Sequence, residues 1–262
     1  MKSLLRHSIA GFCVLIASTA LYARDWSTIR IGVDATYKPF TYKTADGQFT
    51  GFDVDIARAL CAEMKAKCSF VESNWDGIIP GLQARKFDAI ISSMSITDDR
   101  RKVVAFSDKY YTTPGRVVAP KGSDLVAPAK FKGKRVGVLR ASIQETYAKE
   151  VLAPAGAEVV SYDTEDQVYL DLKSKRLDAM VSDQAQASEG FLKTPDGQGF
   201  AFVGPELRDP RIFGYGAGIA VRKSDLDLRD KFNEALKAIR ANGTYKQIND
   251  KYFDFDVYGG ND

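Results

Sequence analysis

A serine-rich segment followed by an arginine is the first feature of this sequence that could do chemistry. Ser92, Ser93 and Ser95 follow the apolar run 89–91, and Arg100 comes a few residues later. Between them lies a Thr-Asp pair, and both residue types are good helix N-caps. Hydroxyl groups, free amides at a helix start and an arginine together suit a small carboxylate ligand.

The apolar run 89–91 fits a buried strand, which would place the serines at its carboxyl end. In open α/β sheets, ligands bind in the crevice outside the carboxyl ends of the strands. The alternative interpretation is a serine-rich turn with a surface arginine, and these residues alone do not decide between the two.

The N-terminal segment predicts export. Residues 1–23 combine the basic Lys2 and Arg6 with an apolar core at 9–21 and a small residue, Ala23, at a plausible cleavage site. We therefore predict a signal peptide over residues 1–23 and a periplasmic location. No later segment approaches the roughly 20 apolar residues of a membrane span.

Removal of the signal peptide changes the charge and the chemistry that remain. Of 37 Lys and Arg residues, Lys2 and Arg6 would leave, so that 35 face 34 acidic residues and the net charge is +1. This balance gives no reason to expect a nucleic-acid partner. The only histidine, His7, would also leave. A histidine-based triad, general base or metal site is therefore excluded from the mature chain.

Two cysteines remain, Cys61 and Cys68. In an exported chain they most simply form one disulfide, and they are too few for a zinc site, which usually needs four ligands. We expect no metal, no cofactor and no enzymatic activity.

Strand-like and helix-like patterns alternate along the chain, which indicates an α/β fold. The first run has expected strands at 30–34, 68–72 and 89–91 and helices at 51–64 and 76–84. The second has strands at 134–139, 158–161 and 177–181 and helices at 142–151 and 165–173. A tail at 225–253 has helical patterns. Two α/β lobes follow from this repeated rhythm.

Five segments in fixed order make the chain resemble the periplasmic amino-acid-binding proteins of ABC importers, in particular the lysine/arginine/ornithine- and histidine-binding branch. These segments are Ile-Gly-Val-Asp-Ala-Thr-Tyr-Lys-Pro-Phe at 31–40, Gly-Phe-Asp-Val-Asp-Ile-Ala at 51–57, Trp-Asp-Gly-Ile-Ile-Pro-Gly-Leu at 75–82, Ser-Met-Ser-Ile-Thr-Asp-Asp-Arg-Arg at 93–101 and Gly-Thr-Tyr-Lys-Gln-Ile at 243–248. The paired cysteines and Ala-Ser-Glu-Gly-Phe-Leu at 187–192 support the branch.

The resemblance implies the type II periplasmic binding protein fold, an α/β fold of two lobes with a ligand cleft between them. Residues 24–112 and 214–262 would form lobe 1, and 115–208 would form lobe 2. The hinge segments would be 112–115 and 209–216. The return of the C-terminal segment to lobe 1 comes from the resemblance, because the repeated rhythm alone suggests two consecutive halves.

The resemblance also implies a set of ligand-binding residues. Arg100 would bind the α-carboxylate of an amino acid, and Asp183 its α-ammonium. Tyr37 and Trp75 would enclose the aliphatic stem, and Asp34 would face the distal cation. The remaining contacts would come from Ser92, Ser93, Ser95, Ser142, Ile143 and Gln144.

Several of these residues have an ordinary structural alternative. Asp183 could cap the helix that follows it, and Asp34 could form a turn. Tyr37 and Trp75 could be core aromatics. Arg140 could point into the cleft, where it would repel cations and accept a second carboxylate, or away from it.

We therefore predict a monomeric solute-binding protein that captures arginine, lysine or ornithine, or protonated histidine, and delivers it to the membrane permease of an ABC importer. Asp34 and Asp183 against Arg100 leave a charge of −1, which a cationic ligand balances. The alternatives are an opine-binding protein of the octopine or nopaline kind, an exported enzyme similar to cyclohexadienyl dehydratase, and a soluble sensor.

Overall fold

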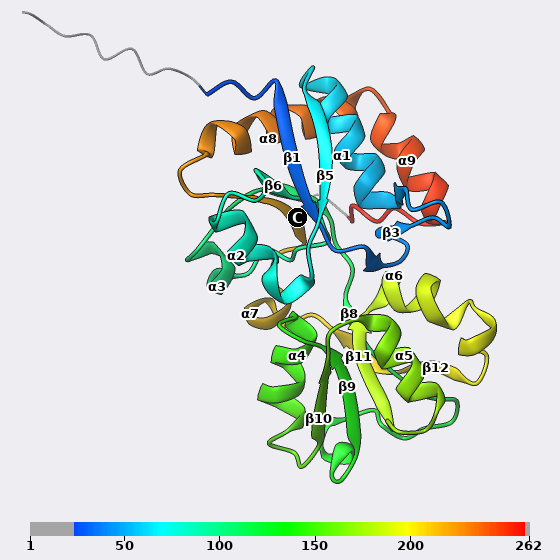
Figure 1. Cartoon of the computed structure of the whole chain (residues 1–262). Coiled ribbons are helices and arrows are strands. Elements are labelled where there is room, and N and C mark those ends of the chain that lie inside the picture. The colour runs from blue at the N-terminus through cyan, green and yellow to red at the C-terminus, as the bar shows by residue number, and fades with distance from the viewer. Residues whose placement is uncertain (1–23, 260–262) are drawn as a thin grey trace, which may run out of the picture.

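Two five-stranded sheets, each flanked by helices, form the protein (Figure 1). The computed structural model describes residues 24–259, so the predicted signal peptide lies outside the described residues. The fold is mixed α/β, as the alternating sequence patterns predict.

The first sheet has the order β5-β1-β6-β13-β7. Its strands are β1 (Thr28–Val33), β5 (Lys67–Glu72), β6 (Ala89–Ile90), β7 (Ala105–Tyr111) and β13 (Ala217–Val221). Strands β1, β5 and β6 are parallel, whereas β13 is antiparallel to β6 and β7. Ala220 of β13 pairs with Ile90 of β6, so a late segment of the chain lies in the centre of this sheet.

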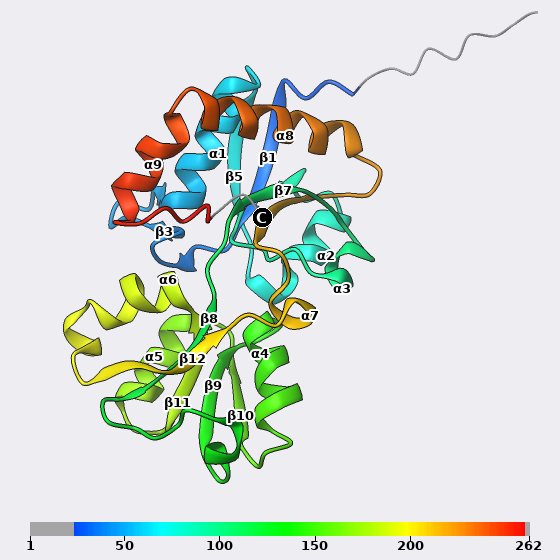
Figure 2. The ribbon, with the colours of Figure 1, turned by 180° about the vertical axis from the view of Figure 1, so that it is seen from behind.

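The second sheet has the order β10-β9-β11-β8-β12. Its strands are β8 (Gly115–Pro120), β9 (Arg135–Leu139), β10 (Glu158–Tyr162), β11 (Ala179–Asp183) and β12 (Phe200–Leu207). The chain passes between the two sheets twice, from β7 to β8 and from β12 to β13 (Figure 2). A small third sheet contains β2 (Thr36–Tyr37), β3 (Thr41–Lys43) and β4 (Phe49–Thr50).

The helices that accompany the first sheet are α1 (Phe52–Glu63), η1 (Trp75–Gly77), α2 (Ile78–Gln83), α3 (Asp98–Arg101), α8 (Leu226–Ala241) and α9 (Thr244–Tyr252). Those that accompany the second are η2 (Pro128–Phe131), α4 (Ile143–Tyr147), η3 (Ala148–Leu152), α5 (Glu165–Lys173), α6 (Gln184–Ala187), η4 (Ser188–Leu192) and η5 (Pro195–Gly197). Helix α7 (Pro210–Phe213) lies in the second passage between the sheets.

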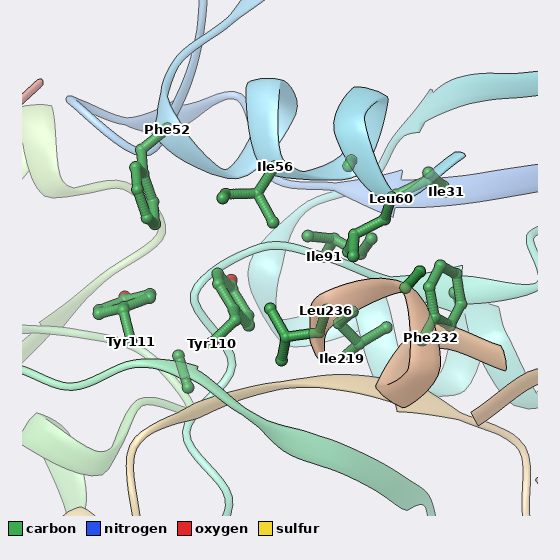
Figure 3. Close-up of a cluster of buried hydrophobic side chains, with 14 of the residues drawn as sticks. Ile31, Phe52, Ile56, Leu60, Ile91, Tyr110, Tyr111, Ile219, Phe232 and Leu236 are labelled. Atoms are coloured by element: carbon green, nitrogen blue, oxygen red, sulfur yellow. The ribbon is translucent and has the colours of Figure 1, made fainter. Parts of the chain in front are cut away.

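The largest core joins early and late parts of the chain (Figure 3). Ile31 and Phe52 pack in one cluster with Ile219, Phe232 and Leu236, all of them buried. Burying such aliphatic and aromatic side chains stabilises the fold by about 1.5–3 kcal/mol each. Helices α8 and α9 therefore belong to the first sheet, although they follow the second one in sequence.

Several local details differ from the sequence-based expectations. The expected helix 76–84 is divided into η1 and α2, and the expected helix 142–151 is divided into α4 and the π-helical turn η3. The expected strand 177–181 begins later and ends at Asp183. Strands β7, β8, β12 and β13 and the short strands β2, β3 and β4 lie outside the expected strands, since β-propensity depends strongly on tertiary context.

The cysteine pairing is confirmed. Cys61 of α1 and Cys68 of β5 form a disulfide with a Cα–Cα distance of 6.1 Å. Within residues 24–259, none of the helices combines the length and apolar content that a bilayer crossing requires.

Candidate functional site

One cavity between the two sheets is lined by all eleven predicted ligand-binding residues. They are Asp34, Tyr37, Trp75, Ser92, Ser93, Ser95, Arg100, Ser142, Ile143, Gln144 and Asp183. The cavity volume is about 120 Å³. Since a buried water needs about 10–15 Å³ measured in the same way, the cavity has room for a solute of several non-hydrogen atoms.

Arg100 is held beside the cavity by the start of a short helix. The Thr97 hydroxyl caps α3 by accepting the Arg100 amide, and Nη1 of Arg100 donates to the Ser95 carbonyl at 3.0 Å. The guanidinium carbon lies 5.2 Å from the centroid of the Trp75 ring. Burial lowers the pKa of Arg100 to about 10, so the side chain remains a cation at neutral pH. The alternative surface salt bridge is made by Arg101, which pairs with Asp98.

The serines at the end of β6 do not all turn their hydroxyls to the cavity. Ser92 Oγ accepts the Asp34 amide at 2.9 Å. Ser93 has a positive φ of 53°, and its hydroxyl donates to the buried Asp53 at 2.8 Å. Asp53 also accepts the Tyr110 hydroxyl at 2.9 Å, while Tyr110 accepts the Ser93 amide. The Ser93 side chain is thus committed to the protein interior, which leaves its backbone to line the cavity.

Asp34 follows β1, and it forms a turn in the way that the structural alternative predicted. Its Oδ1 accepts both the amide and the hydroxyl of Thr36, at 2.9 and 2.7 Å. The side chain is buried, and burial raises its pKa despite these hydrogen bonds. The carboxylate nevertheless lines the cavity, so the turn and the cavity wall are one feature.

Asp183 also combines two arrangements. Its Oδ1 caps α6 by accepting the amides of Ala185 and Gln186 at 2.9 and 3.1 Å. Its Oδ2 accepts the Thr113 hydroxyl. Burial raises the pKa of Asp183 to about 6. Neither Asp183 nor Asp34 forms an ion pair with any described residue, so both carboxyl groups line the cavity without a basic partner.

The remaining predicted residues form the walls. Tyr37 and Trp75 are both half-buried, so neither is a fully enclosed core aromatic. The Ser142 hydroxyl caps α4 by accepting the Glu145 amide at 3.0 Å. This cap fixes Ile143 and Gln144 at the start of the helix, where both line the cavity.

The orientation of Arg140, which the sequence leaves open, is outward. Its side chain is exposed, bonds Asp163 at 2.9 Å and does not line the cavity. The lining includes a different arginine, Arg208, which bonds Glu206 at 2.7 Å. That pair is neutral, so the charge of −1 from Asp34, Asp183 and Arg100 is unchanged.

Sequence reasoning missed other lining residues, notably Thr36, Thr113 and Arg208. A hydroxyl residue two positions after Asp34 is typical of an Asp-initiated turn and could have identified Thr36. Thr113 and Arg208 carry no such local signal. The described residues contain no group of three or more His, Cys, Asp or Glu side chains suited to a metal ion.

The profile of the bacterial extracellular solute-binding proteins, family 3, matches residues 29–255. The chain belongs to this family. The L-arginine-binding protein of Pseudomonas aeruginosa is 53% identical over 254 residues, which cover 97% of this chain and 98% of that protein. The lysine/arginine/ornithine-binding periplasmic protein of Escherichia coli is 48% identical over 259 residues, which cover 97% and 100%.

A solved structure gives the same result for the fold of this family-3 solute-binding protein. An ancestral arginine-binding protein bound to arginine aligns with a TM-score of 0.80 and 38% identity, covering 87% of this chain and 98% of that one. The two-lobed periplasmic binding protein fold predicted from the sequence is therefore confirmed.

Proposed function

We propose that this protein binds a cationic L-amino acid, arginine, lysine or ornithine, in the cavity between its sheets. The observation that carries the proposal is the charge of the cavity. Asp34 and Asp183 line it without basic partners, and Arg100 supplies the one lining cation that no acid neutralises among the described residues. A ligand with net charge +1 balances the remaining −1, whereas a buried unpaired charge is costly.

Each end of an amino acid has a matching group. Arg100 would bind the α-carboxylate through its planar fork, a charge-assisted contact of about 1.5–3 kcal/mol. Asp183 would receive the α-ammonium and Asp34 the distal cation. Tyr37 and Trp75 would lie on either side of the stem, where aromatic faces also attract a guanidinium or ammonium group.

A ligand bound by these residues would be contacted from both sheets, and closure of the two lobes around it would bring these contacts together. Asp34, Trp75 and Arg100 belong to segments of the first sheet, and Asp183 belongs to the second. We assign residues 24–112 and 214–262 to lobe 1, 115–208 to lobe 2, and 112–115 and 209–216 to the hinge. A monomer that closes in this way in the periplasm would present both lobes to the permease of an ABC importer. The names of the relatives support this role.

An opine remains the main competing ligand. With Arg140 directed outward, the basic side chain left for a second carboxylate is Arg208, which already bonds Glu206. A simple basic amino acid therefore fits the cavity better.

A thermal-shift screen tests the ligand class. The mature protein would be unfolded, dialysed and refolded to remove carried-over ligand, then screened against amino acids and opines. A ligand at 100 times its Kd raises the unfolding free energy by about 2.7 kcal/mol. We expect arginine, lysine or ornithine to raise the Tm and glutamate to leave it unchanged. A preference for glutamate, or turnover of a prephenate-like substrate, would contradict the proposal.

A further inference from the structure

The carbonyl oxygen of Ala141 receives two donors from the opposite side of the cavity. Trp75 Nε1 lies 3.2 Å from it, and Nη2 of Arg100 lies 3.5 Å from it, the outer limit of a hydrogen bond. Trp75 and Arg100 lie in η1 and α3, which accompany the first sheet. Ala141 lies between β9, a strand of the second sheet, and α4. One backbone atom thus joins the two halves of the molecule.

The turn that presents this carbonyl is firmly held. Ala141 has a positive φ of 56°, a conformation that alanine rarely adopts. Its amide donates to Glu145 Oε2 at 2.7 Å, and Glu145 is itself fixed by Lys149 at 2.8 Å and by the Ser161 hydroxyl. The Ser142 amide, in the same peptide unit as the Ala141 carbonyl, donates to the Leu139 carbonyl at 3.3 Å. Since strained backbone persists only where its surroundings hold it, Glu145 helps to hold the turn from which the Ala141 carbonyl projects.

The two donors differ in the other hydrogen bonds that they make. Arg100 already donates to the Ser95 carbonyl, and its long contact with Ala141 is the weaker of the two. Under the proposed function, the guanidinium group of Arg100 would bind the carboxylate of the ligand. The indole N–H has no other partner among the described residues, so it would keep the Ala141 carbonyl when a ligand is bound.

We propose that the Trp75–Ala141 hydrogen bond is a latch that holds the cavity closed and sets the rate of ligand release. The inference rests on the proposed function for its release step, but the latch itself requires no ligand. Trp75 therefore acts in two ways: its ring is a wall of the cavity, and its N–H is a positioning contact between the halves. Phenylalanine could supply the wall but not the latch.

The experiment compares Trp75→Phe with the matched control Trp26→Phe. Trp26 is the other tryptophan of the chain, and its indole N–H bonds Asp227 at 2.8 Å, away from the cavity. Release of radiolabelled L-arginine into excess unlabelled arginine would be timed for each variant. We expect release from Trp75→Phe to be about threefold to tenfold faster, the value of one hydrogen bond, with association within about twofold. Trp26→Phe should match the wild type.

A second measurement uses the ligand-free protein. Spin labels at the exposed positions Asp98→Cys and Lys121→Cys report the distance between the halves. Trp75→Phe should populate a longer distance than the wild type. If wild-type protein fails to bind arginine, the proposed function fails while this distance still tests the latch. Unchanged release and unchanged distances in Trp75→Phe would overturn the latch and leave the proposed function standing.

A double-mutant cycle separates the latch from the smaller ring. Glu145→Ala should free the Ala141 turn and also speed release. If the indole acts through Ala141, release from the double variant should be accelerated by less than the product of the two single-variant accelerations, because both changes break the same contact. Multiplicative effects would mean that Trp75 acts only as a wall and would overturn the latch.

Discussion

The Thr113 hydroxyl donates a hydrogen bond to Oδ2 of Asp183. Thr113 lies in the passage from β7 to β8, and Asp183 ends β11 at the cavity. A connecting segment between the two sheets is therefore bonded to an acid that lines the cavity. A cation bound at Asp183 would contact a residue already bonded to the segment that we propose as a hinge.

Arg100→Ala should weaken binding of arginine or lysine by at least tenfold, because it removes the group proposed to bind the α-carboxylate. Isothermal titration calorimetry measures the effect. The neighbouring Arg101→Ala is the control: its partner Asp98 is exposed, and surface pairs contribute little. Equal affinities in the two variants would refute the assignment of Arg100.

Asp183→Asn should also weaken binding at least tenfold while leaving the Tm of the ligand-free protein close to that of the wild type. Asparagine caps a helix about as well as aspartate, so the α6 amides keep an acceptor while the negative charge is lost. Asp183→Ala should lose both binding and stability. If Asp183→Asn binds like the wild type, the residue is a helix cap only.

Binding should release protons near pH 6 and weaken as the pH falls below that value. Burial raises the pKa of Asp183 to about 6, and burial also raises that of Asp34. A bound cation favours the carboxylate, so it lowers these pKa values and drives protons off. Affinity should fall by up to about tenfold per pH unit for each carboxyl group. Calorimetry at pH 6 in buffers of different ionisation enthalpy counts the protons, and proton uptake would contradict the prediction.

Glu165→Gln should stabilise the ligand-free protein at alkaline pH. Glu165 is 1% exposed, its Oε2 has no partner among the described residues, and burial raises its pKa from 4.5 to about 8. Such an acid adds stability that is fully present below pH 4.5 and is lost as the pH rises toward 8. Glutamine cannot ionise and should remove this loss.

Between pH 6 and 8 the change in unfolding free energy reports mainly on Glu165, because Asp53 and Asp183, whose raised pKa values are about 6, titrate at lower pH. Wild-type unfolding free energy should fall there by up to about 1.4 kcal/mol per pH unit. Urea unfolding of wild type, Glu165→Gln and the exposed control Glu63→Gln measures the slope. Parallel slopes for all three proteins would show that Glu165 does not titrate in this range.

Much of the site was predictable because its residues stand at the ends of strands and the starts of helices. Ser92 and Asp34 follow buried strands, while Arg100 and Ser142 stand at or near caps. These positions have local signatures, namely an apolar run followed by a polar residue or an N-cap residue before a helical pattern. For Ser92 and Arg100 these signatures alone suggested a carboxylate site, whereas Asp34 and Ser142 entered the predicted site through the resemblance to the binding-protein family.

The sequence by itself determined the α/β class and the cysteine pairing, and its resemblance to a known family supplied eleven of the residues that line the cavity. The tertiary structure alone decided where their side chains point. Ser93 turns its hydroxyl to Asp53 because its φ is positive, and Arg140 turns outward because Asp163 lies beside it. It also decided the place of β13, which pairs with β6 across about 130 residues. Long-range pairing and side-chain direction depend on partners from distant segments, and a local pattern does not contain them.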